Sequence, residues 1–321
     1  MFKGIVLSVL SSSLFASLYF YSILLKPLTG TEVFGWRMLM IFPFVGLFMW
    51  LSRDIGLINK IIHQVRHRPL LLLGLLLSAF LIGLQQWLFL WAPLNGRGLP
   101  VATGYFLLPL TMLLVGRFLY KEPLCLLQKC AAFFAGLGVA HEIYIGSGFS
   151  WETATVALGF PCYFVLRRTL NTNHLGGFFI DLLFIFPVAG AIALIHITQQ
   201  NASLSVNMFA LLAGLAAISA ISFIFYILAS KILPLTLFGL LGNVEPVLLF
   251  IVAILLGESI ANDKWLTYGP IWVSVILLTL HGLLTLIRKR TRIYDVETNV
   301  MFGNTLKKEP TNLSTGRDDC S

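Results

Sequence analysis

The chain has 321 residues, of which 58% are hydrophobic and only 11% are charged, and its mean hydropathy is +0.88. A soluble domain carries about 25% charged residues, so this chain has too few charges to cover a water-soluble globule. The formal net charge is +8, but the basic residues lie in short gaps between apolar runs and form no single stripe. The composition therefore argues against a soluble globule or a nucleic-acid-binding protein and favours a chain that lies in a lipid bilayer.

A helix needs about 20 apolar residues to cross the core of a bilayer. Runs of about that length follow one another along the chain at 4–25, 33–51, 70–94, 98–120, 124–144, 151–170, 175–197, 207–229, 234–256 and 265–287. The first run is too long for the apolar part of a signal peptide and is interpreted as the first helix. We therefore predict an all-α membrane protein of about ten transmembrane helices. A basic run and a polar tail at 288–321 follow the last span, and we expect this tail to be disordered and cytoplasmic.

The distribution of lysine and arginine predicts the orientation of the chain. With ten spans, the side that holds both termini carries fifteen of these residues in or near its loops, and the other side carries four. The fifteen are Lys3, Arg53, Lys60, Arg66, Arg68, Arg117, Lys121, Lys129, Arg167, Arg168, Lys231, Arg288, Lys289, Arg290 and Arg292. The four are Lys26, Arg37, Arg97 and Lys264. Because basic residues concentrate on the cytoplasmic side, both termini are predicted to be cytoplasmic.

The two halves of the chain show matching features. Arg37 lies six residues before Pro43 in the second run, and Asp181 lies six residues before Pro187 in the seventh. Five helices are an odd number, so two related five-helix halves must have opposite orientations in the membrane. We therefore expect two inverted repeats, at 1–145 and 146–287.

Prolines in the fourth and ninth runs extend this correspondence. Pro109 precedes Glu122 by thirteen residues, and Pro246 precedes Glu258 by twelve. Apolar segments interrupted by proline at matching places in two halves indicate the central site of a transporter. Pro109 and Pro246 are therefore predicted to be helix hinges.

Glu245 is the sharpest candidate for a functional residue, because it lies near the middle of the ninth run. A carboxylate at that depth should face a wet cavity, pair with a cation or be protonated, and a protonatable group suits a proton-coupled carrier. The alternative is a protonated Glu245 that bonds to backbone groups freed by Pro246. Asn243 lies beside it and joins the predicted site.

Arg37 and Asp181 each lie several residues inside an apolar run. Both are candidates for a substrate-binding or gating role. The alternative is that each side chain extends to the nearest membrane surface, Arg37 to the outer one and Asp181 to the cytoplasmic one. For a ligand with a carboxylate, Arg37 is the expected partner, because its guanidinium group binds a carboxylate through two hydrogen bonds.

Aromatic and amide side chains gather in the third run and recur in later ones. Such side chains line pockets for amphipathic molecules, although each one also suits the aromatic belt at the membrane surface. The candidates are Gln85, Gln86, Trp87, Trp91, Asn95, Tyr105, Tyr163 and Tyr226.

Motifs for enzymatic chemistry are missing from the sequence. It contains no HExxH, no GxSxG and no P-loop, and its four cysteines have no metal-ligand spacing. We therefore expect no enzymatic activity, no metal and no cofactor.

Several short motifs, in their order along the chain, resemble those of the bacterial RarD proteins. These belong to the EamA branch of the drug/metabolite transporter superfamily. The motifs are Trp36-Arg37, Trp87-Leu88-Phe89-Leu90-Trp91-Ala92, Gly104-Tyr105-Phe106 with Pro109-Leu110, the acid-to-proline spacing at Asp181, Glu245-Pro246, Gly257-Glu258 and Ile271-Trp272-Val273. The resemblance implies ten helices in two inverted repeats, a central cavity and a bacterial inner membrane. The chain departs from the family pattern at Lys121-Glu122, where the family has Gly-Glu, and at Leu108, where it often has Asn.

These observations predict a secondary transporter that moves a small amphipathic metabolite or drug by alternating access, with protons as a candidate coupling ion. An intramembrane enzyme acting on a lipid-type substrate is one alternative. A membrane sensor or assembly protein that uses the basic tail is another. The sequence leaves a homodimer open and gives neither the substrate nor the direction of transport.

Overall fold

The computed structural model describes residues 2–121, 123–144, 150–200, 206–233, 237–238, 241–260 and 264–302. The regular structure within these ranges is helical, which confirms the predicted all-α class. The helices are α1 (Phe2–Tyr21), the 3-10 helix η1 (Ser22–Leu25), α2 (Gly30–Leu51), α3 (Gly56–His67), α4 (Leu71–Leu94), α5 (Gly98–Leu119), α6 (Leu126–Tyr144), α7 (Trp151–Thr169), α8 (Leu175–Gln200), α9 (Val206–Ile232), α11 (Val244–Leu255) and α12 (Trp265–Phe302).

Seven helical segments are long and apolar enough to cross a membrane: α1 with η1, α2, α4, α5, α8, α9 and the first part of α12. The helix α11 is apolar but has only 12 residues. The chain is therefore a multi-pass membrane protein, and the full count of ten spans stays a prediction.

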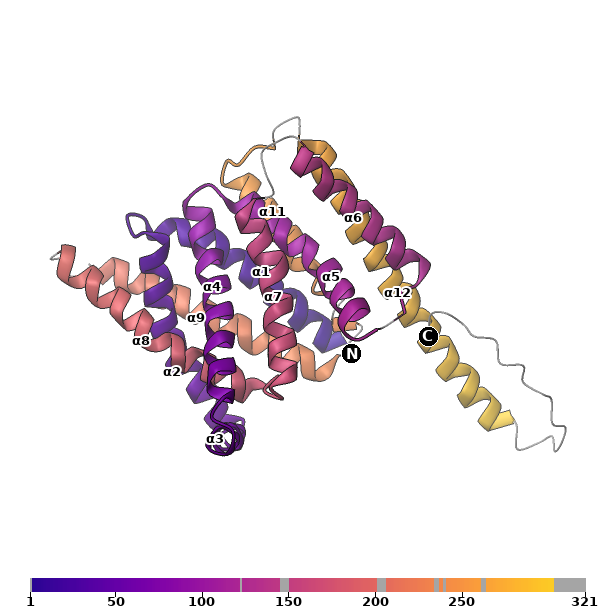
Figure 1. The fold of residues 1–321 in the computed structure, drawn as a ribbon, viewed down its shortest axis with the longest axis horizontal. Helices are drawn as coiled ribbons and strands as arrows, with labels where there is room; N and C mark the ends of the chain where they lie inside the picture. Colours follow the sequence, from indigo (N-terminus) through magenta and orange to yellow (C-terminus); the bar gives the residue numbers. More distant parts are fainter. Residues whose placement is uncertain are drawn as a thin grey trace.

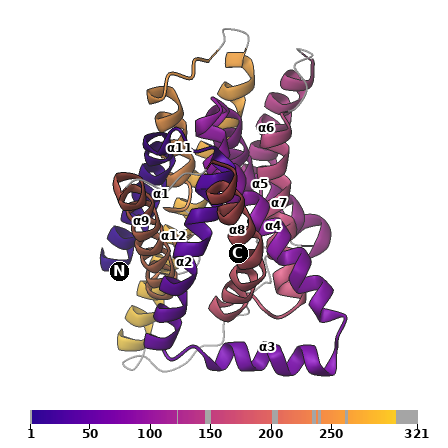
Figure 2. The same cartoon turned by 90° about the vertical axis from the view of Figure 1, so that its left-hand side faces the viewer.

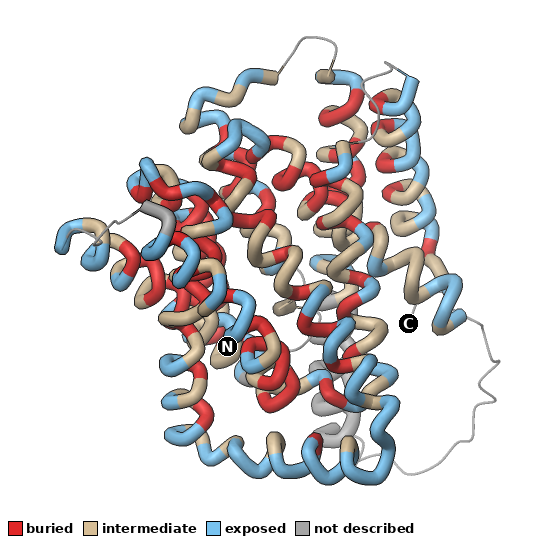
Figure 3. Tube along the Cα trace, turned by 60° about the vertical axis from the view of Figure 1, so that its left-hand side comes forward, coloured by how far each residue is buried: buried red, intermediate tan, exposed pale blue. Residues whose placement is uncertain are grey.

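The outer faces of the bundle are apolar. Leu73 and Phe80 on α4 are each 64% exposed, and Phe133 on α6 is 63% exposed. Figure 3 shows the buried residues where helices face one another and the exposed ones on the outside. Exposed faces of this kind suit contact with lipid tails, whereas on a soluble protein they would form large apolar patches.

Helices from the first part of the chain pack mainly on helices from the second part. The pairs α6 with α12, α1 with α9, α2 with α8 and α5 with α7 make the most extensive contacts. Figure 1 shows α6 and α12 side by side at one edge of the bundle, with α12 extending beyond its partner. The two parts of the chain therefore share one core.

The ninth span, predicted as one continuous helix over 234–256, is interrupted within its described residues. Gly242 and Asn243 form a turn, and α11 begins at Val244. Pro246 therefore lies in the first turn of α11, where a missing N–H costs no helical hydrogen bond. The turn at Gly242 and Asn243 therefore comes just before Pro246, whereas Pro109 lies inside α5. The hinge roles of the two prolines stay predictions.

The helix α3 was not predicted, because its residues lie between the apolar runs 33–51 and 70–94. Ile61 is buried against Leu75 of α4 and Ile180 of α8, whereas Lys60 and Arg66 are exposed. An apolar stripe opposite a polar face is the pattern of an amphipathic helix. Figure 2 shows α3 lying across one end of the bundle.

The last helix is longer than the predicted span, which ended at residue 287. It continues to Phe302, so the expected disorder does not begin at 288 in this structure. Arginine and lysine favour helix, and no glycine or proline interrupts the segment before Gly303. Residues 303–321 lie outside the described part of the chain.

Candidate functional site

A cavity of about 790 Å³ lies within the bundle, between helices of the first and second halves of the chain. A volume of this size suits a metabolite or a small drug. Eight of the predicted residues line it: Arg37, Gln86, Tyr105, Pro109, Tyr163, Asn243, Glu245 and Pro246. Tyr226, which the sequence analysis grouped with them, lines it as well. The structure therefore brings most of the predicted site together from α2, α4, α5, α7, α9 and α11.

Arg37 is fully buried at the wall of this cavity and does not extend to the membrane surface. Its Nε donates to Ser219 Oγ at 2.9 Å, and its Nη1 donates to Gln86 Oε1 at 2.9 Å. Its Nη2 has no hydrogen-bond partner, and no carboxylate among the described residues forms an ion pair with it. The guanidinium group is therefore held in place by two neutral partners and retains an unused donor.

Glu245 lies in the first turn of α11 and faces the same cavity. No hydrogen bond or ion pair joins it to another described residue. Tyr105 lines the same cavity. The cavity wall therefore holds an arginine and a glutamate that form no ion pair with each other, and a tyrosine lies in the same wall.

Asn243 connects the beginning of α11 to α12. It is the N-terminal capping residue of α11, and its Nδ2 donates to Thr279 Oγ1 at 3.1 Å. Because it also lines the cavity, Asn243 fixes the turn that presents Glu245.

The remaining wall of the cavity is rich in aromatic rings. Phe15 and Phe223 meet edge to face with their centroids 5.2 Å apart, and Tyr105 lies 5.6 Å from Phe160. These rings, together with Phe89, Phe164 and Phe178, give the cavity flat apolar surfaces on several sides.

Asp181 does not line the cavity, and its side chain does not reach the cytoplasmic surface either. It is 0% exposed, and its Oδ2 accepts from Arg167 Nη1 at 2.9 Å and from Tyr163 Oη at 3.0 Å. Arg167 also donates from Nη2 to the His174 carbonyl at 2.9 Å. Asp181 therefore joins α7 to α8 through a buried ion pair, and its contact with the cavity is indirect, through Tyr163 and Arg167.

The cavity extends to the end of the bundle where α3 lies. Asp54 and Leu57 line it on one side, and Asn173 and His174 line it in the connection from α7 to α8. Burial and the nearby Arg167 lower the pKa of His174, so this imidazole is neutral at pH 7.

Hydrogen bonds hold several helix ends together at the opposite end of the bundle. The carboxylate of Glu258 accepts from the N–H groups of Gly98 and Leu99 at 2.5 and 2.8 Å, and the Tyr19 hydroxyl donates to the Gly98 carbonyl at 3.1 Å. A carboxylate at a helix N-terminus satisfies free backbone donors and interacts favourably with the helix dipole. Glu258 therefore caps α5.

The glycines on both sides of this contact explain its geometry. Gly257 has φ +91°, which turns the chain sharply after α11 and directs Glu258 toward α5. At Gly98, a Cβ atom would lie 2.6 Å from the Glu258 carboxylate. Any larger residue at position 98 would push the cap away.

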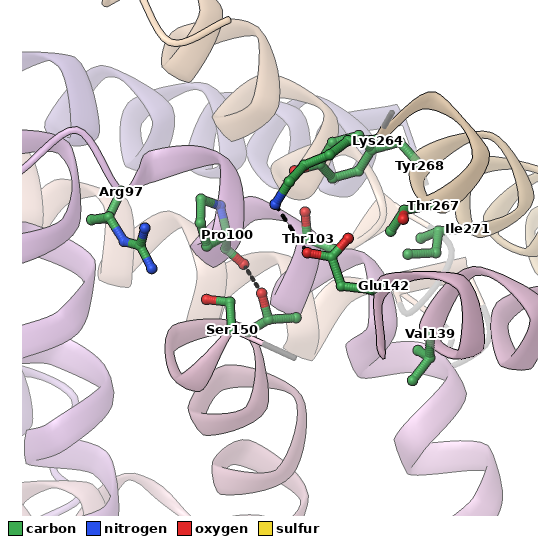
Figure 4. Close-up of a pocket in the computed structure, with 11 residues that line it drawn as sticks. Arg97, Pro100, Thr103, Val139, Glu142, Ser150, Lys264, Thr267, Tyr268 and Ile271 are labelled. Atoms are coloured by element: carbon green, nitrogen blue, oxygen red, sulfur yellow. Dashed lines mark hydrogen bonds and ion pairs between the residues drawn. The ribbon is translucent and has the colours of Figure 1, made fainter. Parts of the chain in front are cut away.

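A second contact at this end joins the beginnings of α5 and α7. Arg97 donates from Nε and Nη2 to the two oxygens of Glu152, at 2.5 and 3.0 Å. A smaller polar cavity of about 150 Å³ lies nearby, with Lys264 bound to Glu142 at 3.0 Å across it. Figure 4 shows this ion pair and Thr103 between Pro100 and Tyr268. The space suits a few water molecules and is too small for a metabolite.

Trp87 and Trp91 do not line the large cavity, contrary to the prediction. They stack on each other with centroids 5.4 Å apart and contact Trp151 at the beginning of α7, and Trp87 Nε1 donates to Thr31 Oγ1 at 3.0 Å. Trp87 and Trp91 are in the last two turns of α4, so their rings lie near the membrane surface. This position is typical of the aromatic belt, the alternative considered above.

Several residues of the site were not predicted. Ser219 binds Arg37, and Arg167 binds Asp181. Each pair joins two different helices, so the sequence alone does not show which residues are partners. The phenylalanines of the wall could not be distinguished among the 26 in the chain. A serine opposite a buried arginine leaves no pattern in a single sequence.

No model of a protein family matches the chain. Individual proteins do match it over most of its length. A protein named as an uncharacterized transporter from Pasteurella multocida is 38% identical over 293 residues, which cover 90% of this chain and 99% of that protein. A second transporter of this description, from Haemophilus influenzae, is 38% identical over 88% of this chain and 95% of its own length.

The chloramphenicol-sensitive protein RarD of Pseudomonas aeruginosa is 40% identical over 293 residues, which cover 90% of this chain and 97% of that protein. RarD proteins of Streptomyces exfoliatus and Escherichia coli match at 27% and 24% identity. Identity of about 40% over nearly full length, together with the multi-pass helical fold, shows that the chain belongs to the RarD family of bacterial membrane transporters.

Proposed function

We propose that the chain is a secondary transporter of the bacterial inner membrane that moves a small amphipathic molecule by alternating access. The observation that carries this proposal is the cavity of about 790 Å³ among apolar helices, with Arg37 and Glu245 in its wall and neither of them paired with an opposite charge in the described part of the chain. Charged groups are rare at such positions in membrane helices and occur where a substrate or ion passes. The names of the relatives support transport as the function.

The two halves, 1–145 and 146–287, act as inverted repeats in this proposal. Helices in corresponding places pack on each other: α2 on α8, α5 on α11, and α6 on α12. The ends of α5 and α11 also share a backbone feature, because Lys121 has φ +57° where the other half has Gly257 at φ +91°. Glu122, the counterpart of Glu258, lies outside the described residues. This correspondence supports a two-fold relation between the halves.

The side to which the cavity opens follows from the charge distribution. Asp54 and His174 lie at the end of the bundle that carries most of the basic residues, which is the predicted cytoplasmic side. In this proposal the structure is the inward-open state, and the contacts of Glu258 and of Arg97 with Glu152 form the closed outer gate. The gate must open when the substrate site faces the periplasm.

Glu245 is the group that couples transport to protons. It faces the cavity, and no basic residue that the structure describes forms an ion pair with it, so it can bind and release a proton without breaking such a pair. Asn243 holds the turn in front of it, and Tyr105 lines the same cavity. We assign the proton a coupling role and assign no metal, cofactor or catalytic residue.

Exchange across a membrane distinguishes this proposal from its rivals. We expect proteoliposomes preloaded with a mixed panel of small metabolites to exchange at least one of them with the labelled form outside, faster than protein-free liposomes. An intramembrane enzyme would instead convert a compound in detergent solution, where no second compartment exists. A sensor or assembly protein would do neither, and its function would be lost when residues 289–321 are deleted.

Removal of the Glu258 cap is predicted to open the outer gate. Ser12 lines the cavity, so a single cysteine at this position, in a chain whose four native cysteines are serine, reports which side has access. In the reference protein, which retains Glu258, a membrane-impermeant thiol reagent should label the cysteine of Ser12→Cys from the cytoplasmic side only. The neutral amide caps α5 less strongly, so Glu258→Gln should raise labelling from the periplasmic side severalfold.

The control for this experiment is Glu32→Gln, which removes a carboxylate from the same end of the bundle. Glu32 accepts from the Thr29 N–H in the capping box of α2, and its Oε1 lies 4.0 Å from His196 Nε2 on α8. Labelling that Glu258→Gln and Glu32→Gln change equally would contradict the gate at Glu258.

A further inference from the structure

Arg37 differs from the other deeply buried charged residues that the structure describes. Asp181 pairs with Arg167 at 2.9 Å, and Glu152 pairs with Arg97 at 2.5 Å, whereas Arg37 binds only the neutral groups of Ser219 and Gln86. A buried charge without a counter-ion is costly, and a lone donor left unsatisfied adds to the cost. Among the described residues, the fold therefore maintains a positive charge without a counter-ion at the wall of the cavity of about 790 Å³.

The hydrogen bonds of Arg37 show how a ligand would be bound. Ser219 occupies Nε and Gln86 occupies Nη1, which fixes the plane of the guanidinium group. The remaining nitrogen, Nη2, is buried and has no hydrogen-bond partner among the described residues. An oxygen of a carboxylate is the acceptor that would both complete this hydrogen bond and neutralise the charge.

The other walls of the cavity restrict what the anion is attached to. Phe15, Phe89, Phe160 and Phe223 provide apolar surface, so the body of the ligand is aromatic or aliphatic. Glu245 lies in the same cavity, and its carboxyl group would repel a second negative charge whenever it is ionised. A cationic ligand without an acidic group would be repelled by the positive charge of Arg37.

We infer that the substrate is an organic monoanion with an apolar body, and that its carboxylate binds Nη2 of Arg37. This inference rests on the proposed transport function, but it names the class of substrate, which that function leaves open. Sulfonates and phosphate monoesters fit less well, the former because their charge is more diffuse and the latter because they carry close to two charges at pH 7.

Three compounds that share a benzene ring and differ in charge test the inference. Phenylacetate is an anion, phenylacetamide is neutral and phenethylamine is a cation. We expect the purified full-length protein in nanodiscs to bind labelled phenylacetate, and both other compounds to compete at least about tenfold less well. Equal competition by the amide or the amine, or no binding of phenylacetate, would overturn the inference.

Variants of Arg37 connect this preference to the residue. Arg37→Gln should weaken phenylacetate binding about 10- to 100-fold and leave the weak binding of phenylacetamide unchanged. Because Arg37→Gln also disturbs two buried hydrogen bonds, Arg37→Lys is the second variant. It retains the charge and should preserve the order of the three compounds. The control is Arg66→Gln, which removes an exposed charge on α3 and should change nothing.

Transport of the three compounds across proteoliposome membranes tests this inference and the proposed function separately. If phenylacetate binds through Arg37 but does not cross proteoliposome membranes faster than in protein-free controls, the anion site stands and transport fails. If phenethylamine or phenylacetamide crosses in preference and Arg37→Gln does not alter that order, transport stands and the anion site is refuted.

Discussion

Asp181→Asn is expected to lower the free energy of unfolding by about 3–5 kcal/mol, because it leaves the Arg167 guanidinium buried without its counter-ion. Asp181 and Arg167 are 0% and 3% exposed in their side chains, so little water can reach the place of the lost partner. The Tyr163 hydroxyl loses a charged acceptor in the same variant. Unfolding by SDS in mixed micelles, followed by circular dichroism, measures the change.

Two controls make this prediction specific. The double variant Arg167→Met with Asp181→Leu removes both charges and should recover most of the lost stability, since apolar side chains of similar size replace buried ion pairs well. Arg66→Gln on the exposed face of α3 should stay within about 0.5 kcal/mol of the wild type. A stability of Asp181→Asn equal to that of Arg66→Gln would show that the pair does not hold α7 to α8.

Glu245→Gln is predicted to abolish accumulation driven by a pH gradient and to leave exchange of substrate intact. The amide has nearly the size of the carboxyl group but cannot take up or release a proton. Because Glu245 has no partner among the described residues, its replacement breaks no ion pair, and the protein should remain folded. Uptake of the labelled substrate into proteoliposomes, with and without an imposed gradient, checks both parts.

Glu245→Asp provides the matched variant, since it retains a protonatable group one methylene shorter. Accumulation should be reduced but still present in this variant. Gradient-driven accumulation that survives in Glu245→Gln would assign Glu245 a structural role and place coupling elsewhere.

Most of the helices could be predicted from composition alone, because a bilayer demands long apolar segments and these have few alternatives. The prediction for α4, for example, differs from the structure by one residue at its beginning and none at its end. The turn at Gly242 and Asn243 was missed, because a window of 20 residues averages over a break in the helix. The helix α3 was missed for the opposite reason, since its apolar residues recur with helical spacing but never form a long run.

The candidate site, too, could be predicted only in part. Arg37 and Glu245 could be found because a charge inside an apolar run is rare and needs an explanation. The role of Asp181 could not be found from its position, because its partner Arg167 was counted among the cytoplasmic charges. Trp87 and Trp91 lie on the same helix as Gln86, and only the rotation of α4 decides that Gln86 lines the cavity while the two tryptophans do not.

Accumulation against a concentration gradient is the most direct test of the proposed transport function. Wild-type protein is reconstituted into proteoliposomes with a mixed panel of small metabolites, and a pH gradient is imposed across the membrane. We predict that at least one compound becomes more concentrated on one side and that a protonophore reverses this. If every compound in the panel crosses no faster than in protein-free liposomes, with or without the gradient, the cavity is not a transport pathway.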